Sequence, residues 1–347
     1  MKKVLGTLVV STMVLLSACG GGGGGQANPA DSGNAGGQQP AASGGAVTLK
    51  AGHTLADTSH YQKGLEKFKE LVESKTNGSV KIETFPNGAL GGERDMIEGL
   101  NVGSIDMVLS STGPMSGFVQ EVTVVDLPFL FRDADHAHKV MDGEVGTDLL
   151  GKVESSMGVK ALAWWENGFR HATNNAHPVN KPEDLKGFKI RTMENDIHMD
   201  SFKAMGAQPT PMAFTELFTA LQQGTIDAEE NPIPVIMTSR FYEVQKHLSL
   251  TRHFYSPSIL MMSQAKFASL SPEQQKAIEE AALEAGKFER ETVAEMEKQY
   301  LGELKSKGME IVENPDLQPF IEAVKPVYEK YEPQFGKELI EKIRNTQ

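Results

Sequence analysis

The chain has 347 residues, enough for two domains of ordinary size with a hydrophobic core in each. Hydrophobic residues make up 39% of it and charged residues 23%, which is typical of a globular protein rather than a disordered one. The formal net charge of −12 argues against a nucleic-acid partner, although a local basic pocket in such a protein can still bind a small anion.

The N-terminal segment, residues 1–18, has the features of a signal peptide. Two lysines precede an apolar stretch, residues 4–16, that is too short to span a membrane comfortably. The sequence "LSAC" at 16–19 resembles the bacterial lipobox, whose cysteine becomes the lipidated first residue of the mature protein. We therefore expect a lipid on Cys19, with an ordinary signal peptide that ends near a cysteine as the alternative. Cys19 is also the only cysteine, so the chain can form no intrachain disulfide.

The next segment, residues 20–46, is rich in glycine, alanine, serine, proline and glutamine and has almost no charge. This composition is typical of a flexible tether, so we interpret 19–46 as a lipidated cysteine and its tether. The glycine run matches a nucleotide-binding pattern only trivially, because no strand and helix surround it. A lipid anchor and a tether, followed by no further stretch of 18 apolar residues, predict a protein held at a membrane surface outside the cytoplasm, in the periplasm or on the outer face of the cell membrane.

From residue 47 the chain predicts a first α/β unit. Alternating apolar residues favour strands over 47–55, 79–86 and 104–110, and helical patterns lie over 61–76 and within 91–103. This order is typical of a mostly parallel sheet, in which ligands bind beyond the carboxyl ends of the strands. The polar residues at or near those ends are His53, Thr54, Glu93, Arg94 and Ser110 to Thr112.

A second α/β unit is predicted to begin near residue 169. The segments 159–168 and 187–193 have strand patterns, a helix follows over 196–205, and another helix leads through Gly224 into a short strand. The stretch "GTIDAEEN" in this unit is similar to "GSIDMVLS" in the first, and each follows a helix. The similarity indicates two lobes that are built in the same way.

The segment 271–308 predicts one long helix. Ser271 can cap its N-terminus, Pro272 suits the first helical position, and Gln274 completes a capping box. If continuous, the helix would be about 50 Å long and would bridge both lobes. Gly286 is the position at which the helix would instead kink or break.

Arg191 lies near the end of a half-buried strand, within "GFKIRTMEN" at 187–195. Phe188, Ile190 and Thr192 fall on one face of this strand and Arg191 falls on the other. A guanidinium at such a place either pairs with an internal carboxylate or binds a carboxylate from outside, and the pattern leaves both possibilities open.

Five motifs follow one another along the body of the chain: "FPNGALGGERDMIEGLNVGSIDM" (85–107), "NGFRHATN" (167–174), "PEDLKGFKIR" (182–191), "GAQPTPMAFTELFTALQQGTIDAEENP" (206–232) and "FYEVQKHLSLT" (241–251). In this order and spacing they resemble the solute-binding subunit of tripartite ATP-independent periplasmic (TRAP) transporters, of the C4-dicarboxylate-binding, DctP-type family. The resemblance covers essentially all of 47–340.

The resemblance implies an α/β, two-lobed fold like that of periplasmic binding proteins, with a long helix that spans both lobes. Lobe I would comprise 47–168 and about 257–290, and lobe II would comprise 169–256 and about 291–347. The lobes of this family close around an organic acid.

The resemblance also implies the site residues. Arg191 matches the family's carboxylate-binding arginine, Arg170 a second arginine, Asn231 an asparagine before a proline, and Phe214 an aromatic residue that packs on the ligand. Three pairs of cleft positions that are less fixed in residue type follow by alignment: His53 and Thr54, Ser111 and Thr112, and Glu194 and Asn195. Glu93 is added to them because it lies near a strand end. Each of these residues has a structural alternative, such as an internal ion pair, a turn, a core contact or a charged helix N-terminus.

Two details depart from the simplest family pattern. Ala228 and Glu229 stand where a glycine and a glutamine are commoner, and we expect only a backbone adjustment there. Glu194 brings a carboxylate close to Arg191, which suggests a ligand that has hydroxyls or an ammonium group as well as a carboxylate.

The predicted function is therefore that of an extracytoplasmic solute-binding protein of a TRAP transporter, a monomer without a cofactor. It would capture a small organic acid, such as a uronate, an aldonate or a C4-dicarboxylate, and deliver it to the membrane permease. A lipoprotein subunit that senses ligands for a signalling system would use the same cleft. A hydrolase is disfavoured, because no H-E-x-x-H, G-x-S-x-G or P-loop motif occurs and Glu229 and Glu230 point to opposite faces of a strand. The stretch Asp135–His138 is read as a solvated helix face rather than a metal site.

Overall fold

A computed structural model describes residues 46–347 of the chain. The predictions for the signal peptide, for Cys19 and for most of the tether lie outside these residues. The strands of the described part are β1 (Val47–Gly52), β2 (Val80–Phe85), β3 (Met107–Ser111), β4 (Val159–Asn174), β5 (Lys189–Thr192), β6 (Gln208–Pro211), β7 (Ala228–Asn231), β8 (His247–Ser263) and β9 (Glu310–Val312).

Helices cover most of the remaining chain. The α-helices are α1 (His60–Lys75), α2 (Glu93–Val102), α3 (Ala134–Asp142), α4 (Glu144–Met157), α5 (Asp196–Ala204), α6 (Phe214–Gln222), α7 (Ile233–Thr238), α8 (Gln264–Ala268), α9 (Pro272–Ser306), α10 (Leu317–Ala323), α11 (Lys325–Phe335) and α12 (Lys337–Asn345). Four short 3-10 helices join them: η1 (Gly113–Gly117), η2 (Glu121–Asp126), η3 (Pro182–Leu185) and η4 (Phe241–Glu243). The predicted fold class, an α/β protein, is confirmed.

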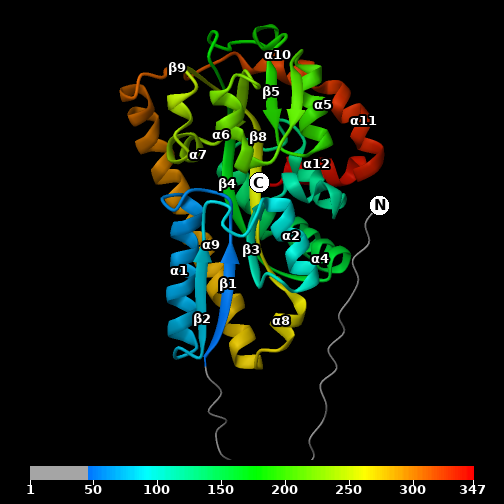
Figure 1. The fold of residues 1–347 in the computed structure, drawn as a ribbon. Coiled ribbons are helices and arrows are strands. Elements are labelled where there is room, and N and C mark those ends of the chain that lie inside the picture. Colours follow the sequence, from blue (N-terminus) through cyan, green and yellow to red (C-terminus); the bar gives the residue numbers. More distant parts are fainter. Residues whose placement is uncertain (1–45) are drawn as a thin grey trace, which may run out of the picture. The chain divides into compact units, whose positions relative to one another are not determined.

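The strands form one sheet in the order β2-β1-β3-β8-β4-β7-β5-β6, with β9 added beside β8 (Figure 1). We call β2-β1-β3 the first half of the sheet and β7-β5-β6 the second half. Read outward from the central strands β8 and β4, the two halves repeat one arrangement, because β3 and β7 take equivalent places. The duplication indicated by the sequence is therefore present in the topology.

The two similar sequence stretches also make the same contact in each half. Asp106 precedes β3 and its carboxylate accepts the backbone N–H of Lys50 in β1 at 2.9 Å. Asp227 precedes β7 and accepts the backbone N–H of Lys189 in β5, also at 2.9 Å. Each aspartate follows a helix that ends near a glycine with positive φ, Gly103 or Gly224. The shared Ile-Asp sequence thus fixes the start of the equivalent strand in both halves.

The sheet is less uniformly parallel than the sequence predicts. The pairs inside each half are parallel, but β4 and β8 run antiparallel to each other and to their inner neighbours. The strand predicted to end at Gly168 continues as β4 to Asn174. Gly168 adopts φ +118° at a register shift in the β4–β8 ladder, so a bulge, not a strand end, accounts for the glycine.

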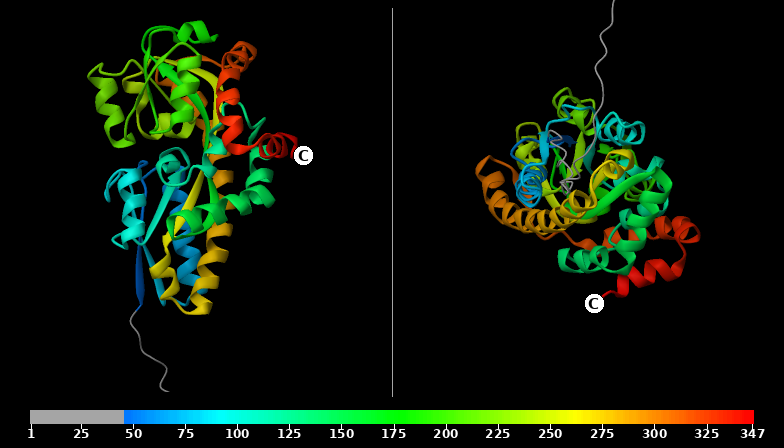
Figure 2. Two further views of the ribbon diagram at one scale, coloured as in Figure 1. Left: turned by 90° about the vertical axis from the view of Figure 1, so that its right-hand side faces the viewer. Right: turned by 90° about the horizontal axis from the view of Figure 1, so that it is seen from below.

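Hydrophobic cores lie on both faces of the sheet because strand side chains alternate between them. Val108 packs into the core beneath α2, α3, α4 and α5, whereas its neighbours Met107 and Leu109 pack into the core beneath α1, α8 and α9. Ile259 and Leu260 of β8 divide between the cores in the same way. Two further views show helices on both sides of the strands, with α11 and α12 next to each other near the C-terminus (Figure 2).

The predicted long helix forms as α9 without a break at Gly286. Its capping box is present, because Ser271 Oγ accepts the N–H of Gln274 and the Gln274 side chain accepts the N–H of Ser271. The helix contacts α1 on the side of the first half and α7 on the side of the second, so it bridges both as predicted (Figure 1). In residues 46–347 no helix combines the length and apolar character needed to cross a bilayer.

Candidate ligand-binding site

The carboxyl ends of strands from both halves meet at one cavity, together with the N-termini of α2 and α6. The cavity has a volume of about 530 Å³, with the solvent at its mouth included. Its lining residues come from the α2 N-terminus, from η1, from β5 and the segment after it, and from the segment after β6: Gly92, Glu93, Arg94, Asp95, Pro114, Arg191, Met193, Glu194, Met212, Ala213 and Phe214. This is the place that the strand order predicts for a ligand.

Arg191 is buried in the wall of this cavity, with only 2% of its surface exposed. Its Nε and Nη2 donate to the carbonyl oxygen of Met212 at 3.0 and 2.7 Å, and its Nη1 has no hydrogen-bond partner in the described part of the chain. The guanidinium carbon lies 5.9 Å from the ring centre of Phe214. No carboxylate of residues 46–347 forms an ion pair with it. Burial, and then the charge of Arg170, lower the pKa of Arg191 to about 10.

Arg170, unlike Arg191, has a carboxylate partner inside the protein. Its Nε and Nη2 donate to the two carboxylate oxygens of Glu230 at 2.5 and 2.7 Å, and Nη2 also donates to the Glu230 carbonyl at 2.6 Å. His253 lies 3.1 Å from the same carboxylate. Burial opposes the ionisation of Glu230, but Arg170 and His253 hold its pKa well below the usual range. Arg170 is thus paired internally, and its Nη1 alone is left without a partner in the described chain.

Asn231 is also engaged inside the protein. Its Nδ2 donates to Glu229 at 2.6 Å and its Oδ1 accepts from Arg170 at 3.3 Å. Thr173 donates to the other oxygen of Glu229 at 2.7 Å. Burial raises the pKa of Glu229 to about 7 despite these two hydrogen bonds. The neighbouring residues Glu229 and Glu230 therefore have different partners.

Glu93 begins α2 and lines the cavity from the side of the first half. Its Oε1 accepts hydrogen bonds from Ser110 Oγ at 3.1 Å and from the N–H and Oγ of Ser111, each at 3.4 Å. Its Oε2 has no hydrogen-bond partner in residues 46–347. Burial raises the pKa of Glu93, and the charge of Arg191 opposes this shift. A carboxylate acceptor thus shares the cavity with a buried arginine.

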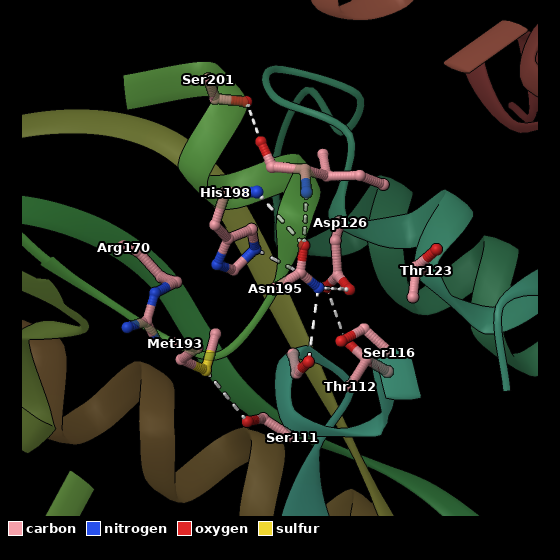
Figure 3. A network of polar contacts seen from close by, with 12 residues as sticks. Ser111, Thr112, Ser116, Thr123, Asp126, Arg170, Met193, Asn195, His198 and Ser201 are labelled. Atoms are coloured by element: carbon pink, nitrogen blue, oxygen red, sulfur yellow. Dashed lines mark hydrogen bonds and ion pairs between the residues drawn. The ribbon is translucent and has the colours of Figure 1, made fainter. Parts of the chain in front are cut away.

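A polar network beside the cavity joins the two halves (Figure 3). Asn195 caps the N-terminus of α5, and its Nδ2 donates to Asp126 at 2.8 Å. Thr112 donates to the other oxygen of Asp126 at 2.7 Å. Burial raises the pKa of Asp126 to about 7. Ser116 adds a second link by donating to the carbonyl of Glu194 at 2.8 Å.

The remaining candidates lie outside the cavity wall. His53 is buried, its Nε2 lies 2.9 Å from Gln62 Oε1, and burial lowers the pKa of the imidazole to about 4. Thr54 lines a neighbouring hollow that Phe214 also borders. His136 and His138 interact with the Ile343 carbonyl and with Glu166, both at 2.8 Å. Nowhere in the described chain do three His, Cys, Asp or Glu side chains gather to hold a metal ion.

The structure therefore divides the predicted site residues into two sets. Those that line the cavity are Arg191, Glu93, Glu194 and Phe214. Those that support it or lie farther off are Ser111, Thr112, Asn195, Arg170, Asn231, His53 and Thr54. Sequence reasoning missed Met193, Met212 and Asp126. Met193 directly follows the predicted strand, which is a usable signal, whereas Asp126 lies in a stretch without a recognisable pattern.

Two halves of α/β structure, two crossing strands, a bridging helix and a cavity between the strand ends define a two-lobed binding protein. The chain belongs to the bacterial extracellular solute-binding proteins of family 7, whose model, DctP, matches residues 51–334. This is the family of TRAP solute-binding proteins that the motifs predict.

Three similar proteins illustrate the family. The 2,3-diketo-L-gulonate-binding periplasmic protein YiaO of Escherichia coli K12 is 41% identical over 87% of this chain and 93% of its own. A TRAP periplasmic solute-binding protein of Polaromonas sp. JS666, solved with D-erythronate, is 48% identical with a TM-score of 0.85 over 87% of this chain and 99% of its own. A Sulfurospirillum deleyianum counterpart, solved with succinate, is 32% identical with a TM-score of 0.83 over 87% and 100%. These relatives are solute-binding proteins rather than enzymes.

Proposed function

We propose that the protein captures a small organic acid in this cavity and that Arg191 binds the carboxylate of the ligand. The observation that supports this most strongly is the burial of Arg191 without an acidic partner. A buried charge is costly unless it is paired, and a ligand carboxylate would pair it. A guanidinium offers two parallel N–H donors that match the two oxygens of a carboxylate, so the contact would also fix the orientation of the ligand.

Other features of the cavity favour an anion at the same place. The N-terminus of α6 borders the cavity, and no side chain caps it. The free N–H groups of a first helical turn attract negative charge. Phe214, the first residue of α6, provides an apolar wall next to Arg191. The site therefore offers donors for a carboxylate and an apolar surface for the carbon chain behind it.

The ligands of the relatives support the same chemical class. The similar proteins described above bind 2,3-diketo-L-gulonate, D-erythronate and succinate, all of which are small organic acids. We propose that this protein delivers such an acid to the membrane permease of a TRAP transporter. We further propose that a lipid on Cys19 holds it at the membrane, since "LSAC" follows a short apolar stretch.

A thermal-shift screen of small organic acids, followed by calorimetry, tests the proposal. A ligand at 100 times its Kd stabilises the folded state by about 2.7 kcal/mol, which moves the melting midpoint by a few degrees. Arg191→Ala is expected to weaken binding by roughly 30-fold to several thousand-fold. Arg191→Lys should also bind poorly, because an ammonium group cannot make the forked contact.

Arg240→Ala is the matched control, because it removes the same charge from an exposed ion pair with Glu243 outside the cavity. It should leave the affinity unchanged. The proposal fails if only neutral sugars or peptides shift the midpoint, or if Arg191→Ala binds the acid as tightly as the wild type.

A further inference from the structure

We propose that the ligand has a single carboxylate with hydroxyl groups at its far end, and that Glu93 makes the site reject dicarboxylates. This inference rests on the proposed function, because it takes Arg191 as the partner of the carboxylate. It adds that the opposite wall of the cavity, at Glu93, recognises a hydroxyl group of the ligand.

Glu93 and Arg191 face one cavity from different halves of the sheet. They form no ion pair with each other, yet the charge of each affects the other. The cavity therefore has a cationic end and an anionic end, separated by more than an ion-pair distance. A ligand that fills the space between them meets both.

Glu93 is fixed as a hydrogen-bond acceptor. Ser110 and Ser111 direct three donors to its Oε1, while Oε2 has no partner in the described chain. An ionised carboxylate can only accept hydrogen bonds, so the group that satisfies Oε2 must be a donor. A hydroxyl on the ligand is such a donor, and a second carboxylate is not.

The charges around the cavity also favour one negative charge on the ligand. Arg170 is already neutralised by Glu230, and Arg94 is exposed and pairs with Glu98 at 3.4 Å. Arg191 is then the only buried cation of the described cavity wall that lacks an acidic partner. A second ligand carboxylate would approach Glu93, and the only cation beside it in the described wall is Arg94, which is exposed and already paired with Glu98. Like charges placed together across a binding interface are strongly unfavourable.

Matched pairs of acids test this inference. D-Erythronate and meso-tartrate share four carbons and two hydroxyls and differ only in the last group, which is an alcohol in one and a carboxylate in the other. D-Galactonate and galactarate form the same kind of pair with six carbons. Calorimetry at pH 7.5 should show that, in each pair that binds, the monoacid binds about 100-fold or more tightly than the diacid.

Substitution of Glu93 should reverse this preference. Glu93→Gln keeps the shape of the side chain and removes its charge, so we expect the diacid to gain about tenfold or more in affinity and the monoacid to lose affinity. Glu83→Gln is the matched control, because it removes the same charge from an exposed position of β2 that does not line the cavity. The Glu83→Gln variant should keep the wild-type preference.

Each outcome has one meaning. A wild-type protein that binds a diacid within tenfold of its matched monoacid overturns the role of Glu93 and leaves the proposed function intact. Equal effects of Glu93→Gln and Glu83→Gln would also overturn it, since they would show only a long-range effect of net charge. Failure of every organic acid in the screen would instead reject the proposed function.

Discussion

Arg170 and Glu230 form a forked ion pair between β4 and β7, in which Nε and Nη2 of the arginine each donate to one oxygen of the carboxylate. Both side chains are fully enclosed by the protein. Arg191, equally enclosed, has only a carbonyl oxygen as its partner. The family resemblance gives both arginines a role in binding the ligand. Removal of Arg170 would leave the Glu230 carboxylate without its ion pair, whereas removal of Arg191 would leave only the Met212 carbonyl without its donor.

Ligand-free stability should separate these arginines. Arg170→Ala leaves Glu230 buried without its cation, so we expect a loss of about 3–5 kcal/mol in the free energy of unfolding. Arg191→Ala removes a buried charge that has no acidic partner, so its effect should stay within about 1 kcal/mol. Urea melts of the ligand-free variants measure both values. A large loss in Arg191→Ala together with a small loss in Arg170→Ala would contradict this assignment.

Asp126 should make stability depend on pH. Burial raises its pKa in the folded state from 3.8 to about 7, so the folded protein holds this proton more tightly than the unfolded chain does. The associated stability is complete below the unfolded pKa and is lost as the pH rises through the folded pKa. Asp126→Asn removes this titration and should flatten the decline in the free energy of unfolding between about pH 4 and pH 7.

Thr112 can rotate its hydroxyl to accept from the new amide, so the network around residue 126 can persist. Denaturant melts at several pH values measure the slope. Asp148→Asn, at an exposed position of α4, is the control and should keep the wild-type slope. An unchanged slope in Asp126→Asn would show that other groups set the pH dependence.

Two glycines of α9 should respond oppositely to substitution by alanine. A Cβ at Gly286 would lie 2.8 Å from Trp165 Cδ1 and 3.2 Å from the Trp164 carbonyl oxygen, so we expect Gly286→Ala to cost about 1–3 kcal/mol. A Cβ at Gly302 would meet nothing within 4 Å, so Gly302→Ala should gain up to about 1 kcal/mol from helix propensity. Thermal melts of both variants measure the difference, and stabilisation by Gly286→Ala would refute the close contact between α9 and β4.

The lipid on Cys19 can be tested in cells. The short apolar stretch followed by "LSAC" predicts that the wild type incorporates a labelled fatty acid and that Cys19→Ser does not. The purified Cys19→Ser protein should still bind the ligand with wild-type affinity, because the lining residues of the described cavity all lie between Gly92 and Phe214. Label on the Cys19→Ser variant would exclude this residue as the attachment site.

Local patterns were sufficient for the elements that have their own start and stop signals. Ser271, Pro272 and Gln274 mark the beginning of α9, and the alternation around Ile190 marks β5. The sequence could not show that Gly168 lies within a bulge, because its role depends on pairing with a strand some 90 residues farther along the chain. In the same way, the sequence could not show that Gly286 lies inside a continuous α9, where the absence of a Cβ leaves room for Trp165.

The candidate site could likewise be predicted from the sequence only in part. The strand position of Arg191 left an internal ion pair and an external ligand both open, and only the family resemblance favoured the ligand. Nothing near Arg170 in the sequence reveals that Glu230 lies opposite it, 60 residues away. Asp126 was missed because its partners, Thr112 and Asn195, come from different halves of the sheet. Chain segments that meet only in the folded state decide which polar residues are free for a ligand.

The crossing strands β4 and β8 determine how the protein unfolds. Each strand pairs along nearly its whole length with the other, β8 continues the ladder into β3, and β4 continues it into β7. Each half of the sheet is one stretch of chain, 47–111 or 189–231, but without β8 or β4 it would expose a row of unpaired backbone groups along β3 or β7. Residues 46–347 should therefore unfold in a single cooperative transition, and neither half should persist as an isolated fragment after the other is cut away.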